Sequence, residues 1–169
     1  MRKRVPNERQ AMKPRKKYRP KPINPTVYLL AMQGASLLSQ QDRLERTNRL
    51  SAAVEVACMG CATREHWALI VDSLNMAEML ARHKVAAGLD AIYAMQETVE
   101  TILDRQKATG TKALKADEQS DLRAYAEAYS ELLAGVTHRQ YFEAQEAAEN
   151  RARRILAGER IPAGRVLEC

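Results

Sequence analysis

The residues best suited to chemistry are two cysteines, Cys58 and Cys61, followed by His66. A Cys-x-x-Cys spacing lets two thiolates on one tight turn occupy adjacent corners of a zinc tetrahedron. Such a site needs a second close pair of ligands, and the other candidates, His138 and Cys169, lie far along the chain. A redox role needs the pair at a helix N-terminus, where the helix dipole lowers a thiol pKa, whereas this pair is expected at a helix C-terminus.

A structural role explains the two cysteines better than a catalytic one. Cys58 and Cys61 continue, at helical spacing, the apolar face of Leu50 and Val54, where free cysteines pack as small hydrophobic residues. The chain has three cysteines, an odd number that favours reduced thiols over a disulfide framework. We therefore predict no metal site and no cofactor.

A run of carboxylates offers a second candidate for catalysis. Glu97, Glu100 and Asp104 are spaced to share one helix face, but Lys107 follows on the same helix, and such runs are usually solvated faces. No nucleophile elbow, phosphate-binding loop, zinc-protease motif or dinucleotide-binding motif occurs in the chain. The sequence predicts that the protein is not an enzyme.

Two polar residues border an apolar helix stripe. Asn75 and Glu78 could fix the register of their helix by hydrogen bonding to a neighbouring loop, or they could mark a surface that faces a partner. We favour the first interpretation.

The strongest functional signal is the charge of the first residues. Residues 1–22 contain ten basic side chains and one acidic one, whereas residues 23–169 contain 17 basic and 20 acidic side chains. Arginine and lysine on an extended chain can follow a phosphate backbone, and an aromatic ring can stack on a base or ribose. The predicted nucleic-acid-binding residues are Arg2, Lys3, Arg4, Arg9, Lys13, Arg15, Lys16, Lys17, Tyr18, Arg19 and Lys21.

Prolines occupy the same stretch of the chain. Five of the six prolines lie in residues 1–25, where they remove backbone donors and disfavour helical geometry. We predict a disordered basic arm over residues 1–25 that binds DNA or RNA. The alternative is that the arm docks on an acidic protein surface, including the body of another copy.

The elements behind this arm are expected to be helices. The chain is rich in Ala, Leu, Glu, Arg, Gln and Met, and aromatic residues make up 5%. We predict one all-α domain over residues 26–158, an antiparallel bundle of five to six helices, followed by a short tail over residues 159–169. Residues 64–83 carry apolar stripes on two faces, led by Trp67, Ile70 and Leu74 on one face and by Met76 and Leu80 on the other, so this helix is predicted at the centre.

Glycines and capping residues predict where the helices begin and end. The other long helices are expected over residues 43–59, 89–106, 118–134 and 138–157, and a shorter one over residues 26–38. Gly60 and Gly110 are expected just past helix ends. Thr63, Asp117 and Thr137 are expected to begin helices, Thr137 through a capping box with Gln140.

Two features bear on location. No apolar run approaches the roughly 18 residues of a membrane-spanning helix, and the basic start is not followed by the apolar segment of a signal peptide. We expect a cytoplasmic protein without a membrane partner.

The order of these parts resembles small helical proteins encoded by phages and prophages of proteobacteria, a group without an assigned activity. The resemblance rests on a KYRPKP opening at Lys17, on ATREHW from Ala62 and on LNMAE from Leu74, and its most recognisable positions include Thr63 and Trp67. It implies a bacterial or phage cytoplasm. With the arm, it predicts a non-enzymatic accessory protein that binds nucleic acid or a nucleoprotein complex. The alternative is a protein-interaction module or inhibitor that docks on a host protein complex.

Overall fold

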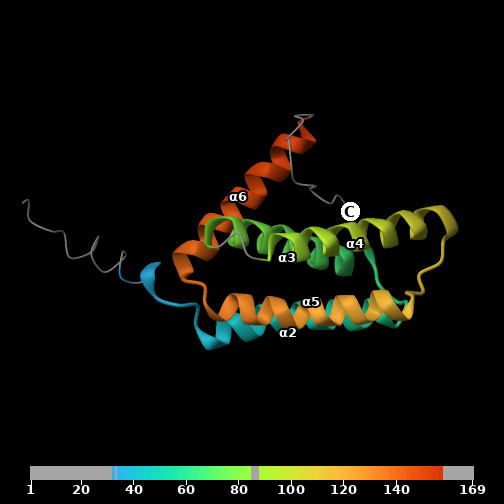
Figure 1. Cartoon of the computed structure of the whole chain (residues 1–169), viewed down its shortest axis with the longest axis horizontal. Coiled ribbons are helices and arrows are strands. Elements are labelled where there is room, and N and C mark those ends of the chain that lie inside the picture. Colours follow the sequence, from blue (N-terminus) through green and yellow to red (C-terminus); the bar gives the residue numbers. More distant parts are fainter. Residues whose placement is uncertain (1–31, 33, 85–87, 158–169) are drawn as a thin grey trace, which may run out of the picture.

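The computed structural model describes residues 32, 34–84 and 88–157 (Figure 1). These residues form an all-α bundle, as predicted. Its five helices are α2 (Gln40–Cys58), α3 (Arg64–Lys84), α4 (Leu89–Thr109), α5 (Ala116–Ala134) and α6 (His138–Leu156). None of these described helices has both the length and the apolar content to cross a membrane. Residues 1–25 and 159–169, predicted as an arm and a tail, lie outside the described part of the chain.

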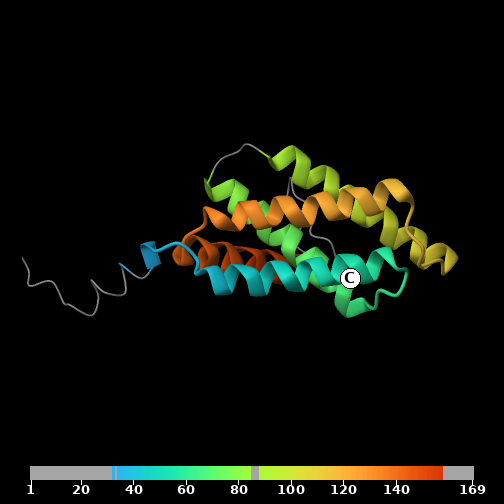
Figure 2. The same ribbon diagram turned by 90° about the horizontal axis from the view of Figure 1, so that it is seen from below.

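Helices α2 to α5 run antiparallel to their neighbours in the chain and stack in two layers (Figures 1 and 2). Helices α2 and α5 pack side by side in one layer, and α3 and α4 form the other. Helix α6 crosses α3 at a steep angle and extends away from the two layers (Figure 1). Helix α3 contacts each of the other four helices, which confirms its predicted central position.

Both apolar stripes of α3 are buried. Ile70 and Leu74 on the main stripe are each 0% exposed, and Met76 and Leu80 on the second stripe are 7% and 1% exposed. Burying a leucine or isoleucine side chain contributes roughly 1.5–3 kcal/mol relative to leaving it in water. Because the burial extends over two faces, α3 supplies the core to both layers.

Local signals set the ends of several helices. The Thr137 Oγ1 accepts a hydrogen bond from the Gln140 backbone N–H at 3.2 Å, and the Gln140 Oε1 accepts one from the Thr137 N–H at 3.0 Å. This is the predicted capping box at the start of α6. Gly60 and Gly110 follow α2 and α4 with φ of 72° and 71°, a left-handed conformation that closes a helix C-terminus.

The predicted start of α5 is wrong by two residues. Helix α5 begins at Ala116, and Asp117 lies in its first turn instead of preceding it. The next residue explains the difference, because the Glu118 carboxylate accepts a hydrogen bond from the Lys115 backbone N–H at 2.9 Å. In this contact the Glu118 side chain, at the third helical position, returns to the backbone of the N-cap residue Lys115, so the helix begins at Ala116.

The predicted helix over residues 26–38 does not extend to its expected end. Leu37 forms an isolated antiparallel bridge with Thr137, and the Leu38 N–H donates to the Val136 carbonyl at 3.0 Å. The His138 N–H in turn donates to the Ser36 carbonyl at 3.0 Å. These tertiary hydrogen bonds hold the backbone extended before α2, and residues 26–31 and 33 lie outside the described part.

Candidate functional site

All of the predicted nucleic-acid-binding residues, Arg2 to Lys21, lie outside the described residues. The structure does place the point where the chain enters the bundle. The backbone hydrogen bonds of Ser36 and Leu38 attach it to the connection between α5 and α6, beside the start of α2 (Figure 1). The first half of α2 lies next to this entry point.

Three arginines lie along that half of α2. Arg43, Arg46 and Arg49 are spaced three residues apart, so they form a row that winds about a third of the way round the helix over about 9 Å. We call these three residues the α2 arginine ridge. Arg43 and Arg46 are half-buried and Arg49 is exposed. Asp42 and Glu45 belong to the same helix, so the ridge is not free of nearby negative charge.

Arg46, the middle residue of the ridge, is held by an aromatic ring. The Arg46 guanidinium carbon lies 4.0 Å from the centre of the Tyr141 ring, and its Nη1 donates to the Tyr141 hydroxyl at 2.7 Å. In the described part of the chain the buried Nε atoms of Arg43 and Arg46 have no hydrogen-bond partner.

Six other described arginines are used differently. Six ion pairs within residues 34–84 and 88–157 each join an arginine to a glutamate. The arginines are Arg82, Arg105, Arg123, Arg139, Arg151 and Arg153. The ridge takes part in none of these pairs. It therefore carries positive charge that the carboxylates of the described bundle do not neutralise by direct pairing.

Glu78 forms the most buried of these charge clusters. Its carboxylate is 0% exposed and accepts from Arg151 Nη1 at 2.7 Å, from Arg82 Nε at 3.0 Å and from Gln96 Nε2 at 3.1 Å. These partners come from α6, α3 and α4. Glu78 fixes helix packing, as favoured from the sequence, but its partners are on helices. The loop partner that we expected for Glu78 is a wrong prediction.

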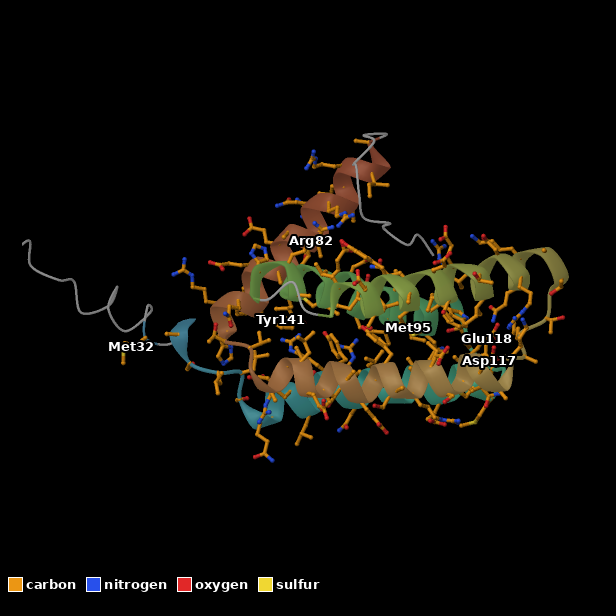
Figure 3. All side chains as sticks on the ribbon, viewed as in Figure 1. Met32, Arg82, Met95, Asp117, Glu118 and Tyr141 are labelled. Atoms are coloured by element: carbon orange, nitrogen blue, oxygen red, sulfur yellow. The ribbon has the colours of Figure 1, made fainter. Side chains whose placement is uncertain are left out.

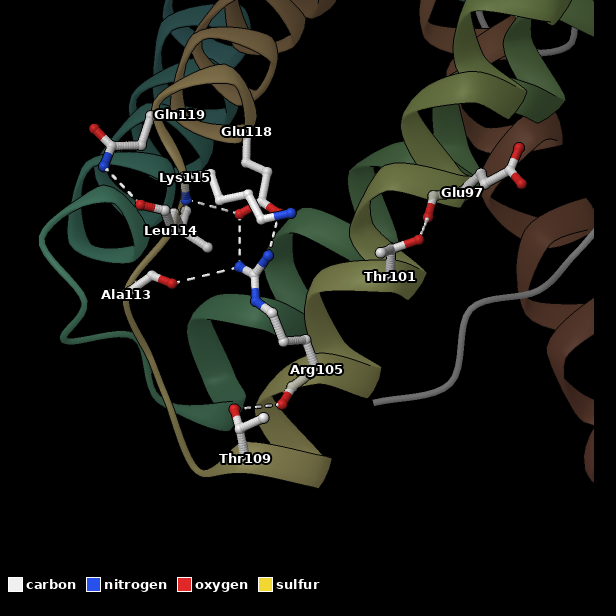
Figure 4. Close-up of polar contacts among 9 residues, drawn as sticks. All are labelled: Glu97, Thr101, Arg105, Thr109, Ala113, Leu114, Lys115, Glu118 and Gln119. Carbon is white, nitrogen blue, oxygen red and sulfur yellow. Dashed lines mark hydrogen bonds and ion pairs between the residues drawn. The ribbon is translucent and has the colours of Figure 1, made fainter.

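A second cluster closes the opposite end of the bundle from Tyr141 (Figure 3). Arg105 on α4 donates two hydrogen bonds to the Glu118 carboxylate on α5, the one from Nη2 at 2.6 Å (Figure 4). These bonds, with that of the Lys115 N–H, hold the pKa of Glu118 below its usual value. The cluster anchors the connection between α4 and α5.

A cavity of about 430 Å³ with a mixed polar and apolar lining lies between α2, α3 and α6, next to the ridge. Arg46 and Arg49 line one side of it, and Asp72, Asn75 and Glu149 also face it. Burial raises the pKa of the Asp72 carboxyl, and the buried Asn75 Oδ1 has no hydrogen-bond partner among the described residues. Since both charge signs line the cavity, it suits water or a small polar solute better than a chain of phosphates.

The cysteines differ from each other. Cys58 is half-buried at the end of α2, and desolvation raises the pKa of its thiol, which disfavours the reactive thiolate. Cys61 is exposed, so the prediction that it extends the apolar face is wrong. The reason is that α2 ends at Cys58 and the chain turns at Gly60. In the described ranges no group of three His, Cys, Asp or Glu side chains is placed to hold a metal ion.

The carboxylate run on α4 faces solvent. Glu97 and Asp104 are exposed and Glu100 is half-buried, as expected for a solvated face. Thr101 bonds to the Glu97 backbone carbonyl at 2.8 Å, which is a local helix contact (Figure 4).

No known family model, curated protein or solved structure matches the chain. Its function must be argued from its own residues.

Proposed function

We propose that this chain is a non-enzymatic accessory protein of a phage or mobile element that binds nucleic acid, or a nucleoprotein complex, through residues 1–22. The observation that carries the proposal is the charge division: ten basic side chains and one acidic one in 22 residues, ahead of a body with more acidic than basic groups. Lysine and arginine that contact phosphates release condensed counterions, which drives binding without sequence readout. Tyr18 adds a ring that can stack on a base.

The described bundle supports this proposal in two ways. Its ion-paired arginines are neutralised by glutamates, so they offer little charge to a ligand. The α2 arginine ridge is not paired in this way, and it begins five residues after Leu38, where the chain enters the bundle. A polyanion bound along residues 1–22 can therefore continue onto Arg49, the exposed member of the ridge.

The test compares two full-length variants that lose the same charge. The arm variant replaces Arg15, Lys16, Lys17 and Arg19 with glutamine, and the matched control replaces four exposed basic residues of the bundle, Arg64, Lys107, Lys112 and Arg154, with glutamine. Each is titrated with duplex DNA, single-stranded DNA and RNA at about 50 mM salt.

We expect the arm variant to lose at least about tenfold in affinity for one of these nucleic acids, because the four lost cations can no longer release counterions from phosphates. The control should lose much less. Equal losses in the two variants would contradict the assignment to the arm. If the natural chain binds none of the three nucleic acids, the proposal fails and a protein-interaction module becomes the better account.

A further inference from the structure

An apolar groove of about 760 Å³ lies between α4 and α5, with α3 as its floor. Its two rims consist largely of alanines that are exposed to solvent: Ala91 and Ala94 on α4, and Ala124 and Ala128 on α5. Tyr125 also lines the groove, and its hydroxyl donates to Ser73 at 3.0 Å. Small rim side chains leave room for the backbone of a further segment to approach closely.

The two helices that form the groove are the most acidic part of the bundle. Helices α4 and α5 contain nine acidic side chains, Asp90, Glu97, Glu100, Asp104, Asp117, Glu118, Asp121, Glu127 and Glu131, against three basic ones, Arg105, Lys107 and Arg123. Arg105 and Arg123 are bound to Glu118 and Glu55. The groove therefore favours a basic occupant.

The acidic groups on α5 lie where a segment in the groove would meet them. Asp121 lines the groove itself. Glu131 is three residues beyond Ala128 and seven beyond Ala124, so it lies on the same helix face as these rim alanines, and Glu127, three residues beyond Ala124, lies at the outer edge of this rim. An occupant needs apolar groups for the alanines and cations for these carboxylates.

The chain itself contains such a segment within reach. It enters the bundle at Leu38, which is bonded to Val136, and Val136 is only four residues beyond Leu132, which lines the groove. The nine residues 23–31, which precede the helical residue Met32, can span up to about 30 Å at about 3.3 Å per residue. The groove runs from Leu132 to Asp121, which is about 16 Å along α5.

We propose that this groove is the docking site of residues 1–22 of the same chain. In this arrangement Tyr18 and the prolines beside it contact the alanine rims, and the arginines and lysines approach Asp121, Glu127 and Glu131. Because the segment is tethered, its effective concentration at the groove is on the order of millimolar, so weak contacts suffice. The inference goes beyond the proposed function because the contact exists without nucleic acid. A polyanion competes for the same cations and releases the segment from the groove.

The direct test uses the full chain with a spin label in the arm. The natural cysteines are removed by Cys58→Ala, Cys61→Ser and Cys169→Ser, and the label is attached to a cysteine introduced by Ala11→Cys. The amide NMR signals of the helices are then recorded at low salt. We expect broadening at Ala91, Ala94, Ala124 and Ala128, and none on the far side of α2. Uniform broadening or no broadening would overturn the proposal.

Two triple variants make this test specific. Asp121→Asn, Glu127→Gln and Glu131→Gln together should abolish the broadening at the groove, because they remove the carboxylates that attract the segment. The control removes three exposed acids elsewhere, Glu45→Gln, Glu65→Gln and Glu146→Gln, and should leave the broadening in place. Equal effects of the two triple variants would contradict groove docking.

Two more measurements are controls. The first tests whether the cysteine substitutions cause the broadening, and the second tests whether the broadening comes from a second copy of the chain. In the first control, the amide chemical shifts of the natural chain are compared with those of the four-glutamine arm variant. The shifts should differ mainly on α4 and α5. Neither protein carries a cysteine substitution. When labelled chains are mixed with isotope-labelled, spin-free chains, no broadening should appear at the groove. Broadening in the mixture would overturn the same-chain assignment in favour of a second copy.

The same groove variant separates this inference from the proposed function. The groove triple variant lacks the carboxylates that compete with nucleic acid for residues 1–22. It should therefore bind nucleic acid at least about three times more tightly than the natural chain at low salt. If no nucleic acid binds any variant but the label still broadens the groove, the proposed function fails and the docking stands. If nucleic acid binds with equal affinity to the natural chain and the groove variant, and no broadening is seen, the docking fails alone.

Discussion

Arginines near Glu78 and arginines on the first half of α2 have different surroundings. Arg151 and Arg82 meet the buried Glu78 carboxylate at 2.7 and 2.9 Å, whereas Arg46 packs on the Tyr141 ring and Arg49 is exposed. The first group is neutralised inside the fold and holds helices together. The second is in none of the ion pairs that join arginines to glutamates in the described part of the chain. The number of arginines therefore says less about function than the partners that the fold gives them.

The largest expected effect is on the Glu78 cluster. Glu78→Ala should lower the free energy of unfolding by about 3–5 kcal/mol, because it leaves the Arg151 guanidinium, whose side chain is 11% exposed, without its carboxylate. Urea denaturation measures this change. Glu97→Ala on the exposed face of α4 is the control and should change stability by less than about 0.5 kcal/mol.

A double variant tests whether the buried ion pair itself is needed for stability. Glu78→Met with Arg151→Met should recover much of the lost stability, because buried ion pairs can often be replaced by apolar residues without a large penalty. A double variant as unstable as Glu78→Ala would show that the cluster contributes more than helix packing.

The next effect is expected at Glu118. Because the folded-state pKa of Glu118 is lowered from its usual value of 4.5, the ionised form stabilises the fold above that pH, and this contribution is lost as the pH falls below it. Glu118→Gln should cost about 1–2 kcal/mol at pH 7 and make stability less dependent on pH between about pH 5 and 3. Denaturation curves at several pH values test this, and parallel pH profiles for the two proteins would refute it.

The smallest effect on stability is expected at the ridge. Arg49→Gln should change the free energy of unfolding by less than about 0.5 kcal/mol, because Arg49 is exposed and forms no ion pair in the described part of the chain. The same change should reduce the slope of log K against log salt for nucleic acid by about one phosphate contact. Glu45→Gln on the same helix is the control and should not reduce that slope.

The sequence was sufficient for the fold and for much of its local detail. Apolar periodicity predicted the five long helices and the central place of α3, and the Thr137 capping box was visible as a spacing of three residues. Such signals are local or depend on helix geometry alone, so one chain reveals them.

Contacts between distant residues were not predictable in the same way. The bridge of Leu37 with Thr137 and the meeting of Glu78 with Arg151 join positions that are far apart in the chain, and nothing in the local pattern marks them. The α2 arginine ridge was missed because Asp42 and Glu45 mask its charge in the sequence, although the spacing of three residues was visible. The groove was missed because exposed alanines look like ordinary helix surface.

The most direct test of the central claim is the salt dependence of nucleic-acid binding by the natural full-length chain. If about five cations of residues 1–22 contact phosphates, log K should fall with log salt at a slope of roughly −4 to −5, which is a loss of about 10²–10³ in affinity between 50 and 200 mM salt. A slope near zero, or one that the four-glutamine arm variant leaves unchanged, would contradict the account.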